Sequence, residues 1–578
     1  MRIRRRCPDP AAESALSGLP PVLRRVYAGR GVDHPDELRQ ELGALAPTDG
    51  LHGLEAAVGC LARAMIGDRR ILVVGDFDAD GASSCALALL ALRGMGARHV
   101  DYLVPNRFEY GYGLSPEIVA EAARSAPDLL VTVDNGISSA DGVAAAHAHG
   151  MEVLVTDHHL PPEHLPDARA IVNPNLPGDG FPSKHLAGVG VIFYVLAGLR
   201  QELQRQGWFA DAAPPQLGTL LDLVALGTVA DLVPLDHNNR ILVEQGLRRI
   251  RAGRGRPGII ALLEVAGRDP SCCTATDLAF AAAPRLNAAG RLDDMAVGIE
   301  CLLAGSPGEA AELAGRLDAL NRERRSIESR MEEEAVAGVN ALTDTLAEGG
   351  APPGICVTDE TWHQGVVGIV ASRLKERFHR PVVAFAPVAA GELKGSARSV
   401  PGLHMRDVLE RVATDHPGLI ERFGGHAGAA GLTLRTDHFA AFREAFVAAV
   451  DAALPAEDRD GVHETDGPLR PGELTLELAH VLRDAGPWGQ GFPEPSFDGC
   501  FRVQQARVVG QRHLKMRLQP EEGDTVVDAI AFRALDAGWD ERLPSRIHAV
   551  YRLDVNRWQG RESLQLVVEA MATAASRE

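Results

Sequence analysis

Three carboxylates stand at alternate positions in one short stretch of the chain. Asp76, Asp78 and Asp80 directly follow the apolar run 71–74, which has the length and composition of a buried strand. Carboxylates this close repel one another unless a cation lies between them. Hard divalent ions prefer oxygen ligands of this kind. The stretch therefore predicts a divalent metal site at the end of a strand.

Two other interpretations compete with a metal site of this kind. The pattern D-x-D-x-D-G also begins an EF-hand loop, in which the twelfth position is a bidentate glutamate. Counted from Asp76, that position is Leu87, and a strand rather than a helix precedes the loop, so we reject the EF-hand. A solvated acidic turn stays open on this stretch alone, because short motifs also occur by chance.

Two further predicted strands end in residues of metal-ligand type. After residue 50, apolar strands alternate with helical stretches, which predicts a parallel sheet covered by helices on both faces. Asp134 follows one strand, and Asp157, His158 and His159 follow another. Such sheets bind ligands beyond the carboxyl ends of their strands. We expect these side chains at one sheet edge, joined by Asp231 after an apolar helix. The predicted strands span 71–74, 100–104, 129–133, 153–156 and 170–172.

Arginines and glycines elsewhere suggest phosphate binding. The segment Pro284–Arg291 has small residues at its centre and is interpreted as a turn, in which Arg285 belongs either to a phosphate clamp or to an ordinary surface loop. In a second α/β region, Ser396 and Arg398 lie near a glycine-rich segment that contains His426. Exposed backbone amides with arginine suit phosphate oxygens, so these residues form a candidate phosphate pocket.

Composition restricts the classes of function. The formal net charge of −19 argues against general coating of nucleic acid but allows a local basic groove. The 8 cysteines are scattered without a C-x-x-C pair, so neither a zinc ribbon nor a disulfide framework is expected. No stretch is apolar enough to span a membrane, and no secretory signal follows the basic N-terminus. We expect a cytoplasmic protein without membrane contact.

The rest of the chain predicts a helix and a barrel. Apolar residues at helical spacing between dense charges predict one long connecting helix over about 306–345. Five short β-prone segments from about 501 onward predict a small barrel. The barrel fits single-stranded nucleic-acid binding, or it is purely structural. Basic residues among its strands are Arg507, Arg512, His513, Lys515 and Arg517.

Successive motifs of the chain resemble those of one enzyme superfamily. Gly75–Gly81, Val133–Gly136, Asp157–His159 and Gly227–Asp231 resemble, in order, the motifs of the DHH phosphoesterases, and Gly424–Ala427 resembles the signature of their DHH-associated domain. Within the superfamily the chain is most similar to the RecJ family, bacterial single-strand-specific 5′→3′ DNA exonucleases. The segment Pro487–Pro495 departs from the family pattern at Trp488 and Phe492.

The resemblance implies an α/β multidomain protein. Its parallel-sheet DHH domain and its second α/β domain are joined by a long helix, and an OB-like β-barrel lies at the C-terminal end. The expected parts are an N-terminal helical lead-in at 1–50, the DHH catalytic domain at 51–305, the connecting helix at 306–348, the DHH-associated domain at 349–455 and the nucleic-acid-binding barrel at 465–575.

The resemblance also implies a two-metal centre that hydrolyses phosphodiester bonds and releases 5′-mononucleotides. Two divalent ions, Mn²⁺ or Mg²⁺, supply an activated water and stabilise the attacking and leaving oxygens of an in-line displacement. Asp134 would be shared by the ions, Asp157 would orient the site and His159 would meet the scissile phosphate. The implied metal ligands are Asp76, Asp78, Asp80, Asp134, His158 and Asp231.

A pocket for the terminal 5′ phosphate would set the 5′→3′ direction of digestion. Tyr110 and Tyr112 would stack on bases or simply pack their loop. The family implies single-stranded DNA as substrate, a role in recombination and mismatch repair, and a single-strand-binding protein and a RecQ-type helicase as partners. The residues implied for 5′-phosphate and DNA binding are Arg107, Arg285, Ser396, Arg398 and His426.

Two rival functions compete with this one, and the second belongs to another class. A DHH phosphoesterase for oligoribonucleotides, cyclic dinucleotides or pyrophosphate would share every metal ligand, but such enzymes usually lack the barrel. A non-catalytic DNA-binding replication scaffold would carry damaged metal motifs, whereas every ligand position here is filled by a competent residue.

Overall fold

The computed structural model describes residues 1–105, 113–210, 213–345, 352–389, 391–455, 459 and 461–574. The chain forms two compact units, which are described separately. The parallel-sheet unit comprises Pro8–Asn321 and Val481–Glu494, and the barrel unit comprises Met1–Cys7, Arg322–His480 and Pro495–Glu578. Among the described residues, no helix is both long and apolar enough to cross a membrane.

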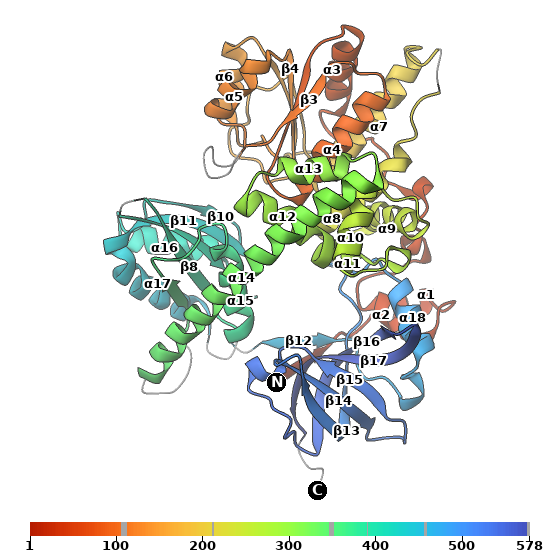
Figure 1. The fold of residues 1–578 in the computed structure, drawn as a ribbon, viewed down its shortest axis with the longest axis vertical. Helices are drawn as coiled ribbons and strands as arrows, with labels where there is room; N and C mark the ends of the chain where they lie inside the picture. The colour runs from red at the N-terminus through yellow and green to blue at the C-terminus, as the bar shows by residue number, and fades with distance from the viewer. Residues whose placement is uncertain are drawn as a thin grey trace. The chain divides into compact units, whose positions relative to one another are not determined.

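The parallel-sheet unit is built on five parallel strands in the order β3-β2-β4-β5-β6, which confirms the predicted sheet. Helices α5 (Pro116–Ala122) and α6 (Ala140–Ala148) pack on one face, and Figure 1 shows α3 (Leu54–Ile66) and α7 (Gly188–Arg205) on the other side of the strands. Burial on both faces explains why the strands are almost entirely apolar. The strands are β2 (Ile71–Gly75), β3 (Val100–Leu103), β4 (Leu129–Val133), β5 (Glu152–Thr156) and β6 (Ala170–Val172).

A helical layer follows the sheet in the chain. The segment Pro284–Arg291, predicted to be a turn, is instead part of helix α12, so that prediction was wrong. Pro284 lies at the start of α12, directly after the π-helical segment Leu278–Ala282, and small residues later in α12 allow close packing. The helices are α8 (Leu221–Ala230), α9 (His237–Arg251), α10 (Pro257–Val265), α12 (Ala283–Leu292) and α13 (Ala296–Leu303).

The predicted connecting helix is present as α14 (Pro307–Thr345), which leads from one unit into the other. The second α/β sheet lies in the barrel unit and has the strand order β10-β11-β9-β8-β7. Two separate apolar cores pack against this sheet. One contains residues of helices α16 (Met405–Asp415) and α17 (Phe439–Ala453), and the other contains residues of helix α15 (Val367–Phe378). Its strands are β7 (Ile355–Thr358), β8 (Val382–Ala389), β9 (Glu392–Arg398), β10 (Arg422–Gly425) and β11 (Ala429–Arg435).

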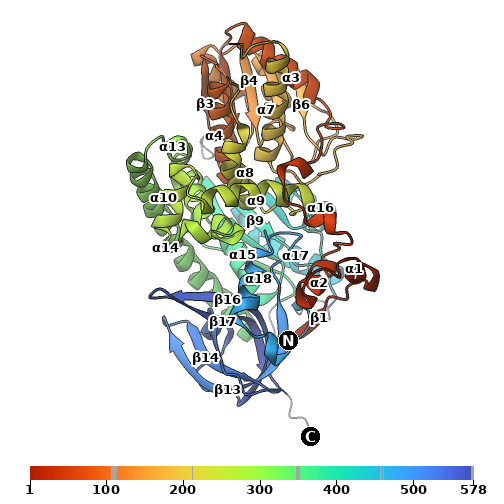
Figure 2. The same cartoon turned by 90° about the vertical axis from the view of Figure 1, so that its right-hand side faces the viewer.

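Five strands near the C-terminus close into a barrel in the order β13-β14-β15-β17-β16, which confirms the predicted barrel. Figure 2 shows β16 and β17 side by side, and they pair along most of their length. Closure removes the exposed sheet edges that favour aggregation. The strands are β13 (Phe497–Val509), β14 (His513–Pro520), β15 (Val527–Ala531), β16 (Arg546–Trp558) and β17 (Arg561–Thr573).

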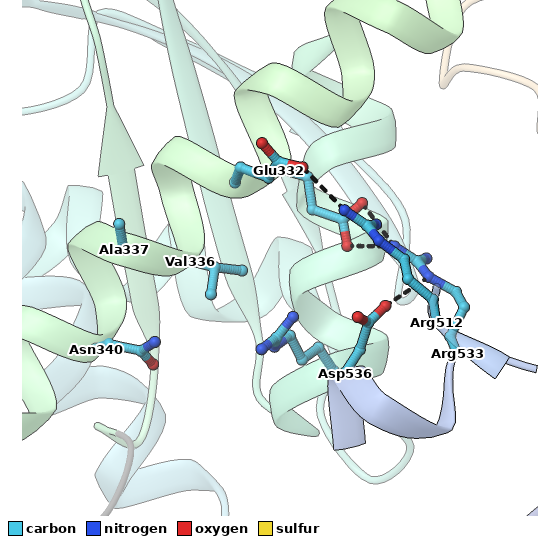
Figure 3. A pocket seen from close by; sticks show the side chains of 9 residues that line it. Glu332, Val336, Ala337, Asn340, Arg512, Arg533 and Asp536 are labelled. Atoms are coloured by element: carbon cyan, nitrogen blue, oxygen red, sulfur yellow. Dashed lines mark hydrogen bonds and ion pairs between the residues drawn. The ribbon is translucent and has the colours of Figure 1, made fainter. Parts of the chain in front are cut away.

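Ion pairs fasten the barrel to α14 inside the barrel unit. Arg533 pairs with Glu332 at 2.9 Å and with Asp536 at 3.0 Å, and Arg512 pairs with Glu333 at 2.9 Å. These groups line a cavity of about 230 Å³ (Figure 3). Because these two guanidinium groups are already neutralised by carboxylates, we interpret this cavity as a joint between barrel and helix.

The N-terminal lead-in begins with a strand, which the sequence did not predict. β1 (Arg2–Arg5) pairs in parallel with β12 (Val462–Thr465), and Arg5 binds the buried Asp498 of the barrel at 2.7 Å. The helical prediction fails here because the pairing partner lies more than 450 residues away in the chain. Short helices, including α1 (Pro10–Ala15) and α2 (Pro21–Ala28), then follow in the parallel-sheet unit.

Candidate metal centre

Carboxylates and histidines meet at the carboxyl ends of three neighbouring strands. Asp76, Asp78 and Asp80 follow β2, Asp134 follows β4, and the Asp157–His159 motif follows β5. Asp231 joins them as the residue that ends helix α8. The sheet therefore brings together, in one unit, all the side chains that the sequence predicted as metal ligands.

The acidic loop after β2 is held by backbone hydrogen bonds. Asp78 caps helix α4 (Ala79–Gly94), and its Oδ1 accepts hydrogen bonds from the N–H groups of Asp80 and Gly81, both at 2.9 Å. Asp80 in turn accepts from Gly188 at 2.7 Å and Val189 at 3.1 Å, at the start of α7. A carboxylate at a helix N-terminus is favoured by the helix dipole, so both side chains are fixed in place.

Two glycines allow the carboxylates to approach the helices closely. Asp134 has a left-handed backbone, with φ of 62°. A β-carbon on Gly188 would lie 2.5 Å from the Asp134 Cβ, and one on Gly227 would lie 2.5 Å from Asp80 Oδ1. The left-handed backbone of Asp134 is strained, and such strain persists where the surrounding structure fixes the residue in place, often at functional sites.

The ligand atoms lie within reach of a common ion. Nε2 of His158 is 3.1 Å from Asp134 Oδ1 and 3.5 Å from Asp231 Oδ2. Within each of three overlapping groups, one possible ligand atom per residue lies within 4.8 Å of the others. Asp134 and His158 each occur in two of these groups. The groups are Asp76–Asp78–Asp134, Asp80–His158–Asp231 and Asp134–His158–His159.

The electrostatics of the cluster favour a bound cation. Burial, and then repulsion by Asp78, raise the pKa of Asp80 to about 7. Burial, followed by repulsion from Asp80 and Asp78, also holds the pKa values of Asp134 and Asp231 well above their usual range. Such shifts mean that the ionised cluster is costly without compensating positive charge.

The two histidines are set to opposite protonation states. Burial, and next the charge of His159, lower the pKa of His158 to about 4, so its imidazole is neutral at physiological pH. Burial also opposes the charged form of His159, but the hydrogen bond and charge of Asp157 outweigh it and raise that pKa to about 9. Nδ1 of His159 lies 2.7 Å from Asp157 Oδ1. His159 is therefore a cation, whereas His158 suits metal ligation.

His158 supplies a direct test of the fit to a metal. Its buried Nε2 faces two carboxylates, but neither contact has the geometry of a hydrogen bond, and no other described residue bonds this nitrogen. A neutral imidazole nitrogen among carboxylate oxygens is a donor set that suits Mn²⁺. The residues present therefore fit a divalent metal centre.

The candidate phosphate pocket lies in the barrel unit. Arg398 donates hydrogen bonds to Ser396 Oγ at 2.9 Å and to Ala397 O at 2.8 Å, and no described carboxylate lies within ion-pair distance of it. A β-carbon on Gly368, in the first turn of α15, would lie 2.9 Å from the Arg398 guanidinium. His426 is exposed in the turn between β10 and β11.

The other predicted DNA-binding residues differ in their placement. Arg285 is engaged by Asp318 at 2.8 Å and by Ala281 O at 2.6 Å, so phosphate binding would require its release from these partners. Arg107, Tyr110 and Tyr112 lie outside the described residues.

Sequence reasoning missed residues that shape the metal centre without binding it. Gly188 and Gly227 provide the space for two carboxylates. Asn287 of α12 accepts a hydrogen bond from the Ala79 N–H at 2.8 Å, within the acidic loop. Asn287 lies within the segment Pro284–Arg291, whose arginines suggested phosphate binding.

Comparisons with known proteins agree with this arrangement. The model of the DHH family, N-terminal domain, matches residues 70–228, that of the DHHA1 domain matches 352–453, and that of the RecJ OB domain matches 465–570. The single-stranded-DNA-specific exonuclease RecJ of Dickeya dadantii is 56% identical over 98% of each chain. The chain belongs to the RecJ family. RecJ of Escherichia coli is 54% identical, again over 98% of each chain.

Solved RecJ structures share the fold. RecJ from Thermus thermophilus in complex with Mn²⁺ is similar with a TM-score of 0.79 and 32% identity, covering 100% of this chain and 80% of that one. The same protein in complex with Mg²⁺ gives a TM-score of 0.76 and 30% identity, covering 100% and 79%. The multidomain α/β fold predicted from the sequence is therefore confirmed.

Proposed function

We propose that this protein is a metal-dependent, single-strand-specific 5′→3′ DNA exonuclease that releases 5′-mononucleotides. The observation that carries the proposal is the neutral, buried His158 Nε2 facing Asp134 and Asp231 at the edge of the parallel sheet. Membership of a family whose relatives are named single-stranded-DNA-specific exonucleases supplies the substrate class.

Two ions, Mn²⁺ or Mg²⁺, are the proposed cofactors. Asp134 and His158 each occur in two of the three overlapping ligand groups, but only the carboxylate has two oxygens with which to bind two ions, which supports the assignment of Asp134 as the shared ligand. Divalent ions bound there would supply an activated water and stabilise the attacking and leaving oxygens. The relatives solved with Mn²⁺ and with Mg²⁺ support either metal. The proposed ligands are Asp76, Asp78, Asp80, Asp134, His158 and Asp231.

His159 is proposed to bind the scissile phosphate. Its hydrogen bond to Asp157 fixes the ring and keeps the imidazole protonated, and its side chain is about a third exposed. Asp157 is itself held by the N–H groups of Ile137 at 2.9 Å and of His159 at 3.0 Å. A positioned imidazolium stabilises the negative charge that develops on phosphate oxygens during the displacement.

The 5′ polarity is assigned to the pocket at Ser396 and Arg398. A guanidinium that pairs with no carboxylate in the described part of the chain, beside a hydroxyl and the first turn of a helix, suits a terminal phosphate. His426, Arg285, Arg107, Tyr110 and Tyr112 remain proposed contacts to DNA. A cytoplasmic location stays a prediction from the sequence. A role in recombination and mismatch repair, and cooperation with a single-strand-binding protein and a RecQ-type helicase, stay predictions from the family.

End-labelled DNA tests the proposal. The protein is incubated with Mn²⁺ and a single strand labelled in turn at each end, beside a blunt duplex and an Asp134→Ala variant. We expect the 5′ label to leave first as a mononucleotide, only from the single strand and not with the variant. If the DNA stayed uncleaved but dinucleotides or pyrophosphate were hydrolysed, the result would favour a small-substrate phosphoesterase. No cleavage with any divalent ion would favour the scaffold.

A further inference from the structure

Helix α12 contacts the loop that carries the first three carboxylates at two points. Asn287 Oδ1 accepts a hydrogen bond from the Ala79 N–H at 2.8 Å. One turn along the same helix, Gly290 packs against the carbonyl of Phe77, so closely that a β-carbon there would lie 1.9 Å from that oxygen. Phe77 and Ala79 are the two chain neighbours of Asp78. The helix therefore holds the backbone on both sides of a proposed metal ligand.

An account of the backbone donors shows what Asn287 contributes. The first four N–H groups of a helix have no partner within the helix. In α4, the N–H groups of Asp80 and Gly81 bind the side chain of Asp78, and the N–H of Ala82 makes the first bond within the helix, to the carbonyl of Asp78. The N–H of Ala79, the first helical residue, is satisfied by Asn287 from a helix about 200 residues away in the chain.

The neutrality of this acceptor matters. Without the Asn287 oxygen, the N–H of the buried Ala79 would need another acceptor, and the nearest candidates are the carboxylates of its own loop. An oxygen taken in this way would be diverted from metal ligation. An aspartate at this position would also accept the bond, but it would add charge to carboxylates that already crowd one another. An amide oxygen satisfies the donor without that cost.

We propose that Asn287 is a positioning residue of the metal centre, which acts through the Ala79 backbone to hold Asp78 and Asp80 ready for the ion. The inference rests on the metal site of the proposed function, but it does not depend on the substrate. Partners that orient metal ligands in this way typically change metal affinity by about 10- to 100-fold.

Titration calorimetry of Mn²⁺ into the metal-free, full-length protein, without DNA, measures the effect. Asn287→Ala and Asn287→Leu both remove the acceptor, and leucine keeps a side chain that branches at the γ-carbon. Both variants are expected to weaken Mn²⁺ binding by about 10- to 100-fold. Asn287→Asp keeps the acceptor but adds a charge, so its Mn²⁺ affinity is expected to lie between that of Asn287→Leu and that of the wild type. Gly290→Ala, which displaces the loop from its other side, is expected to weaken binding as well.

Asn238 offers a matched control. It is a buried asparagine of the same unit, and its side chain likewise accepts a hydrogen bond from a backbone N–H, that of Ala46 at 2.9 Å. Asn238→Ala is expected to lower the melting temperature but to leave Mn²⁺ affinity unchanged. Wild-type affinity in Asn287→Leu, equal weakening in Asn238→Ala, or no binding by the wild type would overturn the proposal. Mn²⁺ binding with these variant effects but without DNA cleavage would uphold it and refute the nuclease assignment.

Discussion

Gly188 and Asp134 are packed so closely that a β-carbon on the glycine would lie 2.6 Å from the Oδ1 of the aspartate. The same glycine donates its N–H to Asp80 at 2.7 Å. One residue at the start of α7 therefore sets the positions of two proposed metal ligands that come from two different strands. No side chain larger than hydrogen fits there without moving at least one of them.

Gly188→Ala is therefore expected to weaken Mn²⁺ binding by about ten-fold or more, because a displaced carboxylate leaves the ion incompletely coordinated. Calorimetry with Mn²⁺ provides the measurement. Gly315→Ala is the matched control, since Gly315 lies within helix α14 and has nothing within 4 Å of the added carbon. The control is expected to stabilise the protein by about 0.5–1 kcal/mol and to leave Mn²⁺ affinity unchanged. Equal affinity in the two variants would contradict the assignment.

Leu232 predicts a stability effect next to the proposed metal ligand Asp231. Its φ is 59°, a left-handed conformation at the end of helix α8, where glycine is usual, and its side chain is 57% exposed. This conformation costs a leucine about 1–2 kcal/mol, which a glycine would not pay. The greater unfolded-state entropy of glycine would offset about 0.4–1 kcal/mol of that gain. Leu232→Gly is expected to raise the free energy of unfolding of this unit by about 0.5 kcal/mol.

Urea denaturation followed by tryptophan fluorescence measures this change. Leu160→Gly is the control, because Leu160 is similarly exposed, at 62%, and has no positive φ. Glycine there adds unfolded-state entropy without relieving strain, so this variant is expected to be destabilised. If Leu232→Gly were destabilised to the same extent, strain at Leu232 would not be the reason.

The clustering of the proposed ligands was predictable because it depends on local pattern and on a general rule. An apolar strand followed by a carboxylate can be recognised from a few neighbouring residues, and parallel strands bring such ends to one edge. Asp76, Asp134 and His158 were found in this way. Identification of the second α/β domain and the barrel used the family resemblance as well as strand patterns.

The errors concern contacts between distant parts of the chain. The strand β1 forms only because β12, more than 450 residues later, offers an edge, and its four residues carry no apolar alternation. The helix α12 resembles a turn in sequence because its alanines and glycine serve close packing. The role of Asn287 depends on an acceptor position that only the folded loop defines.

The pH dependence of the barrel unit should depend in part on Asp498. Burial raises the pKa of this carboxyl, but hydrogen bonds from Arg5, Thr465 and His548 outweigh it and hold the pKa below its usual value of 3.8. A depressed pKa stabilises the fold above the unfolded-state value, and the contribution is lost as the pH falls below about 4. The wild type is therefore expected to lose more stability between pH 5 and pH 3 than Asp498→Asn does.

Thermal melting across this pH range, with Arg5→Ala alongside, checks the prediction. Arg5→Ala removes the hydrogen bond that lowers the pKa of Asp498 the most, so it should flatten the same part of the pH profile. A matched control is Arg557→Ala, whose partner Glu562 forms an exposed pair of the kind that contributes little. Parallel pH profiles for the wild type and Asp498→Asn would contradict the assignment.

Arg398 provides the sharpest test of polarity. Burial lowers the pKa of its guanidinium, but the group stays charged, and Ser396 and a backbone carbonyl are its described hydrogen-bond partners. A hydrogen bond to a charged group contributes about 1.5–3 kcal/mol, which corresponds to about 10- to 100-fold in affinity. Arg398→Ala is therefore expected to raise KM for 5′-phosphorylated single strands by about that factor, with little change for 5′-hydroxyl strands.

Steady-state kinetics on the two substrates separate this role from a structural one, because general misfolding would lower kcat on both. Arg435→Ala is the matched control: Arg435 lies on the neighbouring strand β11 but is exposed and paired with Asp437 at 3.0 Å. Arg435→Ala should leave the preference for a 5′ phosphate intact. Mn²⁺ affinity should stay unchanged in every variant of this pocket. If Arg398→Ala kept the wild-type preference, the terminal phosphate would bind elsewhere, and the polarity would need another origin.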